Sequence, residues 1–219
     1  MRAITQYTGV PTLALALVVL YGLLAFGVRI VVQARRTGST GFKGLRGVSR
    51  SERIVGLLFT LALVLCLAGP ALQLAGTISP IEALDGEAAR ILGVVLACMG
   101  IAVTSLAQFA MGDAWRVGVD PAEHTELVTD GPFSRVRNPI YAAMIPSFAG
   151  IALVAPNAVT IAGAVLLTLA VELQTRLVEE PHLSRVHGER YTAYAARTGR
   201  FLPGIGRLRA DGTRLHTSH

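Results

Sequence analysis

A short polar sequence, VELQTRLVEEPHL at residues 171–183, follows a long apolar stretch near the end of the chain. On a helix, four of its ionisable residues fall on one stripe, at offsets of zero, four, seven and eight: Glu172, Arg176, Glu179 and Glu180. Ionisable side chains inside an apolar span are costly, so they usually face a cavity or a partner. The stripe therefore predicts a polar pocket that can hold a charged or hydrogen-bonding ligand.

A simpler explanation exists for two of these residues. Glu172 and Arg176 are one helical turn apart, where an ion pair between them would satisfy both charges. Such a pair would be structural and would require no ligand. The sequence leaves both interpretations open.

The start of the preceding apolar stretch is the other side of the predicted pocket. The sequence GPFSRVRNPIYAAMIPSF, at residues 131–148, places Arg135 and Arg137 directly before an apolar run. A proline is well placed in a first helical turn, because its missing amide hydrogen would have no partner there. The pattern predicts a helix that begins at Pro139, with Asn138 as its N-cap.

Composition indicates that membrane helices position these residues. The chain of 219 residues is 52% hydrophobic and 16% charged, with a mean hydropathy of +0.54, which is more apolar than an ordinary soluble domain. Five stretches approach the roughly 20 apolar residues that a helix needs to cross a bilayer; they are residues 12–32, 54–75, 91–111, 139–155 and 158–178. The prediction is one all-α integral membrane domain over residues 1–219.

The last two stretches have features of their own. The fourth is short and contains Pro146, which predicts a kink or tilt. Only Pro156 and Asn157 separate it from the fifth stretch, so the two are predicted to form a tight helical hairpin.

Basic residues predict the orientation of the helices, because segments rich in Lys and Arg stay on the cytoplasmic side. The connection between the first two spans contains six of them: Arg35, Arg36, Lys43, Arg46, Arg50 and Arg53. The next connection, residues 76–89, contains none. The N-terminus is therefore predicted outside and the C-terminus in the cytoplasm. This asymmetry also explains the net charge of +6 without a nucleic-acid partner.

The tail is predicted to form a further helix along the cytoplasmic membrane surface, ended by Gly199. Its approximate apolar face consists of Leu183, Val186, Tyr191 and Tyr194. Residues 207–219 are expected to be flexible. Arg29 and Arg90, at the edges of spans, are expected to extend toward the lipid head groups. Scattered histidines and two cysteines within apolar spans predict no metal site and no disulfide framework.

The polar residues of this half of the chain also follow a known pattern. In order, they are Gly131-Pro132-Phe133, Arg137-Asn138-Pro139-Ile140-Tyr141, Glu179-Glu180, Leu183, Gly188, Tyr191, Tyr194 and Arg200-Phe201-Leu202-Pro203. In this order and spacing the chain resembles the isoprenylcysteine carboxyl methyltransferase family of integral membrane methyltransferases. The resemblance covers roughly residues 115–203, and the first two spans fit it only as generic helices.

The resemblance implies an enzyme that binds S-adenosylmethionine at the cytoplasmic membrane face. Residues 1–111 would be three N-terminal membrane helices, and residues 112–206 a cofactor-binding connector, helical hairpin and tail. The substrate would be a lipophilic molecule or membrane lipid, most simply a carboxylate, and the compartment the plasma membrane of a prokaryote. In agreement with this, no strand leads into a glycine-rich loop of the dinucleotide-binding kind.

The resemblance also implies roles for individual residues. The expected cofactor contacts are Glu126, Leu127, Val128, Phe133, Asn138, Pro139, Tyr141, Glu179 and Glu180. Arg176 lies about one position from a substrate-facing arginine of the family, and Arg176 or Arg137 would orient an acceptor carboxylate by charge-assisted hydrogen bonds. An ionised carboxylate needs no general base, so methyl transfer would depend on alignment and exclusion of water.

The pattern departs from the family at Asn138, which replaces the usual histidine before the proline. Asparagine retains hydrogen-bonding capacity but cannot titrate. Together with the offset of Arg176, this leaves an isoprenoid acid, a phospholipid amine or another amphipathic molecule open as the acceptor. Two other functions also remain open. One is a membrane reductase of the sterol-reductase type that uses NADPH, and the other is a noncatalytic membrane scaffold that binds no cofactor.

Overall fold

The computed structural model describes residues 2–40, 49–115 and 126–208. These residues form helices without a β-strand, and their β-bridge joins Val136 to Gly199. The helices are α1 (Arg2–Gly22), α2 (Arg29–Thr37), α3 (Arg50–Leu74), α4 (Glu87–Ala110), α5 (Pro139–Val154), α6 (Ala158–Gln174), α7 (Glu180–His187) and α8 (Glu189–Arg197). π-Helical segments, η1 (Leu23–Val28) and η5 (Thr175–Glu179), join α1 to α2 and α6 to α7. Short 3-10 turns are η2 (Glu82–Leu84), η3 (Gly112–Ala114) and η4 (Gly131–Ser134).

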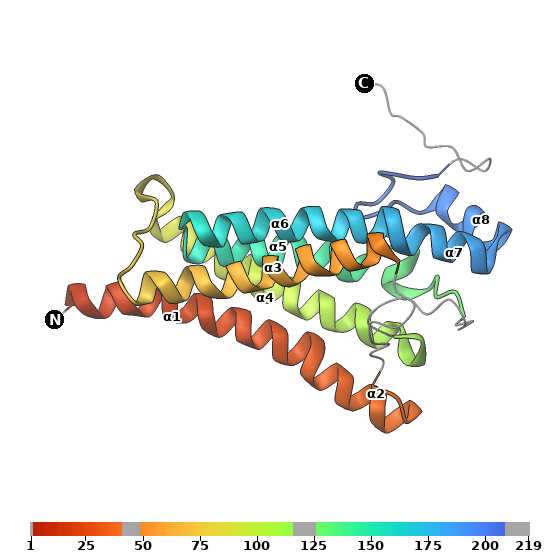
Figure 1. The fold of residues 1–219 in the computed structure, drawn as a ribbon, viewed down its shortest axis with the longest axis horizontal. Helices are drawn as coiled ribbons and strands as arrows, with labels where there is room; N and C mark the ends of the chain where they lie inside the picture. The colour runs from red at the N-terminus through yellow and green to blue at the C-terminus, as the bar shows by residue number, and fades with distance from the viewer. Residues whose placement is uncertain (1, 41–48, 116–125, 209–219) are drawn as a thin grey trace, which may run out of the picture.

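The long helices lie side by side along the longest axis of the molecule (Figure 1). The N-terminus is at one end, and α2, α7 and α8 are at the other. Within the described ranges, four helical segments are long and apolar enough to cross a membrane: Thr8–Thr37, Arg50–Leu74, Glu87–Ala110 and Ala158–His187. They correspond to four of the predicted stretches, and the remaining one forms α5, an apolar helix of 16 residues that contains Pro146 without ending there.

Small residues bring the helices of this bundle into close contact. A Cβ atom on Gly93 of α4 would lie 2.5 Å from the carbonyl oxygen of Gly150 in α5. A Cβ on Gly163 of α6 would lie 2.7 Å from Sγ of Cys66 in α3. Membrane helices associate through such small residues, because there the gain comes from van der Waals packing. α4 with α5 and α3 with α6 therefore form two closely packed pairs.

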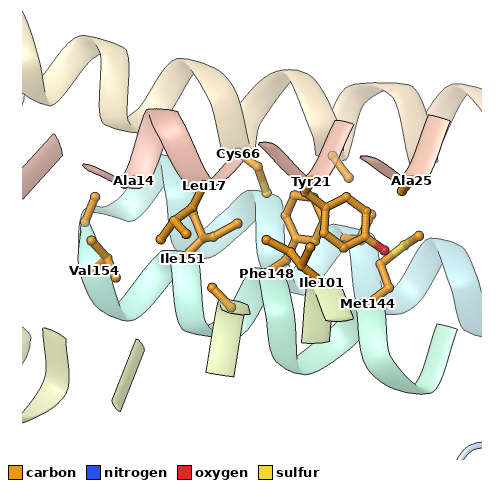
Figure 2. Packing of buried hydrophobic residues seen from close by; sticks show 14 of the residues in the cluster. Ala14, Leu17, Tyr21, Ala25, Cys66, Ile101, Met144, Phe148, Ile151 and Val154 are labelled. Carbon is orange, nitrogen blue, oxygen red and sulfur yellow. The ribbon is translucent and has the colours of Figure 1, made fainter. Parts of the chain in front are cut away.

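A core of buried side chains joins α1 to these pairs. The ring of Tyr21 meets the ring of Phe148 edge to face, with centroids 5.0 Å apart (Figure 2). The Tyr21 hydroxyl lies 3.2 Å from Oγ1 of Thr104 in α4, which satisfies a buried polar group. Tyr141 packs against this core, so the core also supports one of the predicted site residues.

The hairpin between α5 and α6 is confirmed. Asn157 caps α6 by accepting a hydrogen bond from the Thr160 amide at 2.9 Å. Its Nδ2 donates to Oε1 of Gln73 at 2.8 Å, which ties the turn to the end of α3. The short connection thus has defined partners and holds α5 and α6 antiparallel.

The prediction for Arg29 was wrong. Its side chain does not extend toward the head groups but is buried, with 1% of its surface exposed. The guanidinium stands 4.9 Å from the ring centroid of Trp115 and 5.8 Å from that of Phe109, and it donates to the carbonyl of Gly112. Aromatic faces and a carbonyl at the end of α4 compensate for the loss of water around the charge. Arg90 is partly exposed and pairs with Asp85 at 2.5 Å.

The tail also differs from the prediction. A single surface helix ended by Gly199 was expected, but the helix breaks at Gly188, whose φ of +52° suits glycine. The rings of Tyr191 and Tyr194 are buried against Leu127 and Leu183. The apolar face therefore packs on the protein itself. Of residues 207–219, only 207 and 208 lie within the described part of the chain.

Candidate active site

The π-helical segment η5 divides the predicted stripe. A π-helical turn widens the helix locally and so changes the direction in which the following side chains point. Glu172 and Arg176 remain one turn apart and paired, whereas Glu179 and Glu180 contact different elements. The four residues consequently belong to three separate arrangements rather than to one surface.

Glu179 meets Tyr141, which confirms that the end of α6 faces the start of α5. The Tyr141 hydroxyl donates to Oε1 of Glu179 at 2.6 Å. Gln174 donates to the same oxygen through Nε2, at 3.4 Å. All three side chains are half-buried. Gln174 was not predicted, because an uncharged residue within an apolar run gives no distinctive signal.

Glu180 is the centre of a buried ionic cluster with Arg137 and Arg200. Its Oε1 accepts from Nη2 of Arg137 at 2.7 Å and from Nε of Arg200 at 2.8 Å. Its Oε2 accepts from Nη2 of Arg200 at 2.7 Å. No more than 8% of any of these residues is exposed. The hydrogen bonds to Glu180 raise the pKa of Arg200 above its usual value.

Arg137 has a structural position that the sequence did not reveal. Besides Glu180, its guanidinium donates to the carbonyls of Thr198, of Ala195 at 3.1 Å and of Gly206 at 3.0 Å. These carbonyls belong to the end of α8 and the segment after it. Arg137 thus fastens the C-terminal segment to the start of α5.

Backbone hydrogen bonds hold the same junction. The amide of Arg137 donates to the carbonyl of Gly199 at 2.8 Å, and that of Asn138 to the carbonyl of Arg200 at 3.1 Å. Gly199 is enclosed, because a Cβ there would lie 2.8 Å from the amide nitrogen of Gly204. Arg200 and Gly199, which the predicted site did not include, are therefore essential to its shape.

Asn138 stands at the predicted N-cap position, and α5 begins at Pro139 as expected. Its side chain does not cap the helix, however. Nδ2 donates instead to the carbonyl of Arg200 at 3.3 Å. This bond to the C-terminal segment orients the amide group, and its oxygen accepts no hydrogen bond from the first turn of α5. The first amides of α5 consequently have no cap from this side chain.

The connector residues occupy varied positions. Phe133 is buried, and its carbonyl accepts from the Tyr194 hydroxyl at 2.6 Å; burial raises the pKa of Tyr194 to about 12. Leu127 packs against Tyr191 and Tyr194. Val128 is half-buried, whereas Glu126 is exposed and makes no side-chain hydrogen bond to the described chain. Residues 116–125 of the predicted connector lie outside the described residues.

Glu172 and Arg176 form the predicted i, i+4 ion pair, through Oε2 and Nε. About 33% of each side chain is exposed. The structural explanation of these two charges is thus confirmed. Since the pair is only half-buried, its charges can still reach a polar molecule beside η5.

A known protein family is similar to the part of the chain that carries most of this geometry. A family description, phospholipid methyltransferase, matches residues 88–190. Residues 88–190 are therefore similar to membrane methyltransferases of this kind. This confirms the resemblance found in the sequence motifs. This stretch contains the contact of Tyr141 with Glu179, together with Arg137 and Glu180 of the buried cluster.

A curated relative and a solved structure give further similarities. The chain is similar to the nickel-cobalt-cadmium resistance protein NccN of Alcaligenes xylosoxydans xylosoxydans, with 26% identity over 120 residues. The matched region covers 54% of this chain and 56% of that relative. The fold resembles a eukaryotic intramembrane Ras methyltransferase, isoprenylcysteine carboxyl methyltransferase, with a TM-score of 0.51 and 20% identity. That match covers 81% of this chain and 60% of the other. The chain thus spans less than two thirds of either protein.

Proposed function

We propose that this chain transfers a methyl group from S-adenosylmethionine to a lipophilic acceptor at the cytoplasmic membrane face. The observation that carries the proposal is the contact between Tyr141 and Glu179. It joins the start of α5 to the end of the last long span, within the domain that matches the phospholipid methyltransferase family. Membrane helices and a polar site at one end of the bundle suit a substrate that stays in the bilayer.

The side chains around this contact fit the proposed cofactor. S-adenosylmethionine supplies an activated methyl group on a positively charged sulfur, next to an amino acid group, ribose hydroxyls and adenine. The Glu179 carboxylate can accept hydrogen bonds from amino or hydroxyl groups, and Tyr141 adds aromatic surface. The start of α5, which Asn138 does not cap, presents amides to a carboxylate.

The buried cluster around Glu180 has a different role in this proposal. Both carboxylate oxygens of Glu180 already accept hydrogen bonds from arginines. We therefore assign Glu180, Arg137 and Arg200 as positioning residues. They hold the C-terminal segment against α5, and so fix the backbone that carries Glu179. Phe133, Pro139, Leu127 and Val128 support the same end of the bundle, and Glu126 lies at its exposed edge.

The acceptor of the proposed reaction is a carboxylate, oriented by Arg176. Nε of Arg176 is bonded to Glu172, and the half-exposed guanidinium can exchange or share this partner with an acceptor. One acceptor oxygen would form the new bond to carbon as the sulfur takes the electrons of the broken bond. The family match favours a second acceptor, the amine of a phospholipid. Its proton could pass to the Glu172 carboxylate.

The proposed arrangement in the membrane has five spans, with α5 as the fourth along the chain and the N-terminus outside. Residues 1–111 support the site, and residues 112–206 form it. At about 24 Å for its 16 residues, α5 is shorter than the bilayer core, and the bundle surrounds it. A tag at the N-terminus should react with an impermeant label on intact cells. Labelling only after the cells are opened would overturn the orientation.

Calorimetric titration of the detergent-purified chain tests the cofactor. We expect saturable heat with S-adenosylhomocysteine and none with NADPH. Heat from NADPH alone would support the membrane reductase instead. Binding of neither molecule, by a protein that still unfolds cooperatively, would favour a noncatalytic scaffold.

The chemistry of the product separates the two acceptors. Membranes containing the chain would be incubated with S-adenosylmethionine labelled in its methyl group, and the lipid extract treated with mild alkali. A methyl ester releases volatile labelled methanol, whereas an N-methyl group stays with the lipid. Arg176→Ala should lower kcat more than it weakens S-adenosylhomocysteine binding. Equal losses in both would place Arg176 in the cofactor site.

A further inference from the structure

A groove lies between α4 and α5 beside the turn η4. Its volume is about 730 Å³, within the range of roughly 300–1,000 Å³ typical of pockets that hold small molecules. Leu96 and Leu106 of α4 line it, together with Ala142 and Pro146 of α5. The surface of the groove is mainly apolar.

The shapes of the two helices explain why a groove exists here. At Gly100 the backbones are so close that a Cβ would collide with Ser147. On the outer side of this contact, α4 presents the large side chains of Met99 and Val103, both exposed. α5 presents small or compact residues there, such as Ala142 and Pro146. Large side chains beside small ones leave a hollow that the bundle does not fill.

The length of the groove matches one leaflet of a bilayer. Leu96 and Leu106 are ten positions apart on α4, and both line the groove. Ten helical residues rise about 15 Å, and the hydrocarbon core is about 30 Å thick, so a single leaflet is about 15 Å. One hydrocarbon chain of a membrane lipid can therefore lie along the groove.

A positive charge stands at the polar end of the groove. Arg135 lines it, next to Ser134 at the end of η4. The side chain is exposed, and it forms no hydrogen bond or ion pair with any described residue. This distinguishes it from Arg137 two positions later, which is buried and donates to Glu180 and to three backbone carbonyls. A cation at the polar end of an apolar groove is complementary to a lipid with an anionic head group.

The groove lies on another face of α5 than the contact between Tyr141 and Glu179, although Pro139 at the start of α5 lines it. Successive residues on a helix are rotated by about 100°, so Tyr141 points away from the face that carries Ala142 and Pro146. Neither Tyr141 nor Glu179 lines the groove. A lipid there would not be in position to accept the methyl group.

We infer that this groove binds one anionic membrane lipid, with a hydrocarbon chain between α4 and α5 and its phosphate at Arg135. The membrane itself supplies this occupant, since the exposed side chains of Met99 and Val103 face the bilayer on the outside of the bundle. The bound lipid would cover the apolar groove beside η4. The conformation of this turn, which precedes α5, would then depend on the lipid composition of the membrane.

Native mass spectrometry of the whole chain released from nanodiscs tests this inference. Discs of phosphatidylglycerol mixed with phosphatidylcholine would be compared for the unaltered chain and for Ala142→Trp, which fills the groove. We expect one phosphatidylglycerol to remain bound to the unaltered chain and most of it to be lost in the variant. Val165→Trp, on an exposed face of α6 outside the groove, is the matched control and should retain the lipid.

A second variant tests the head group separately. Arg135→Gln should abolish the preference for phosphatidylglycerol over phosphatidylcholine, while some lipid of either kind remains in the intact apolar groove. Arg190→Gln, an exposed arginine of α8, should keep the preference. The smaller replacement Ala142→Leu, with the thermal unfolding midpoint of each variant, separates loss of lipid from loss of fold.

Several outcomes would overturn the inference. Equal retention of both lipids by the unaltered chain would remove the assigned role of Arg135. Full retention in folded Ala142→Trp would place the lipid elsewhere. A dimer that dissociates in Ala142→Trp would show that a second copy of the chain occupies the groove.

Discussion

Glu179 and Glu180 are neighbours in the chain, yet their carboxylates are in very different surroundings. Glu180 is 8% exposed, and two arginines donate three hydrogen bonds to it. Glu179 is half-buried and accepts from the neutral groups of Tyr141 and Gln174. The first environment holds chain segments together. The second is less enclosed, and its carboxylate lies beside the hydroxyl of Tyr141 and the amide of Gln174.

The comparison shows how a membrane protein can keep a polar site in place. An ion cluster in a low-dielectric environment is rigid, because separating its members leaves buried charges unpaired. Because Glu179 is joined to Glu180 through the backbone, the cluster also restricts the position of Glu179. The proposed division of labour is therefore physical: Glu180 contributes mainly to stability, and Glu179 mainly to ligand binding.

The largest expected effect is on folding, from Glu180→Gln. It removes the charge between Arg137 and Arg200 and leaves two buried guanidinium groups without a counter-ion. We expect the free energy of unfolding to fall by about 3–5 kcal/mol. Reversible unfolding in mixed detergent micelles measures this. Glu189→Gln, at an exposed position of α8, is the control. Unchanged stability would mean that the cluster does not hold the C-terminal segment.

Glu179→Gln should act on binding instead. Loss of a charged acceptor costs about 1.5–3 kcal/mol, so the Kd for S-adenosylhomocysteine should rise by roughly 10- to 150-fold. Calorimetric titration measures the Kd, and the unfolding free energy should change less than in Glu180→Gln. An unaltered Kd would refute the proposed role of Glu179. A large loss of stability would show that the two glutamates do not differ as proposed.

Tyr141→Phe should give a smaller change in the same direction. The substitution keeps the ring against the core and removes only the hydroxyl that donates to Glu179. A neutral hydrogen bond contributes about 0.5–1.5 kcal/mol, which corresponds to a Kd about 2- to 13-fold higher. The same titration measures it. An unaltered Kd would show that this hydroxyl does not help Glu179 to bind the ligand.

Glu172→Gln should have the smallest effect on folding. Its ion pair with Arg176 is about one third exposed, and such pairs contribute about 0–1 kcal/mol. Unfolding measurements should therefore place this variant close to the unaltered chain. A destabilisation as large as that of Glu180→Gln would show that the half-exposed pair is as structural as the buried cluster.

Much of the architecture could be predicted from local patterns. Apolar stretches near bilayer length correspond to the four long helical segments, and Pro156 with Asn157 correctly indicated the hairpin. The approach of Tyr141 to Glu179 could be predicted only by resemblance, because 38 residues separate them in the sequence. Gln174 was missed, since an uncharged residue within an apolar run is also typical of an ordinary helix.

Three predictions failed because they assumed that polar and aromatic groups either face the surroundings or pair within their own helix. Arg29 is buried against Trp115 rather than extended toward head groups. Tyr191 and Tyr194 pack inside the protein rather than on the membrane. The side chain of Asn138 bonds to the C-terminal segment rather than to its own helix. In each case a distant segment supplied a better partner.

The sequence by itself determined the helical membrane character, the short turn between α5 and α6, and the resemblance to membrane methyltransferases, because these depend on composition and on motifs that are local or ordered along the chain. Only the tertiary structure decided which ionisable residues meet. The π-helical segment η5 directs Glu179 toward Tyr141, and the returning C-terminal segment brings Arg200 to Glu180. Buried charges require partners, and those partners come from helices that are far apart in sequence but adjacent in the bundle.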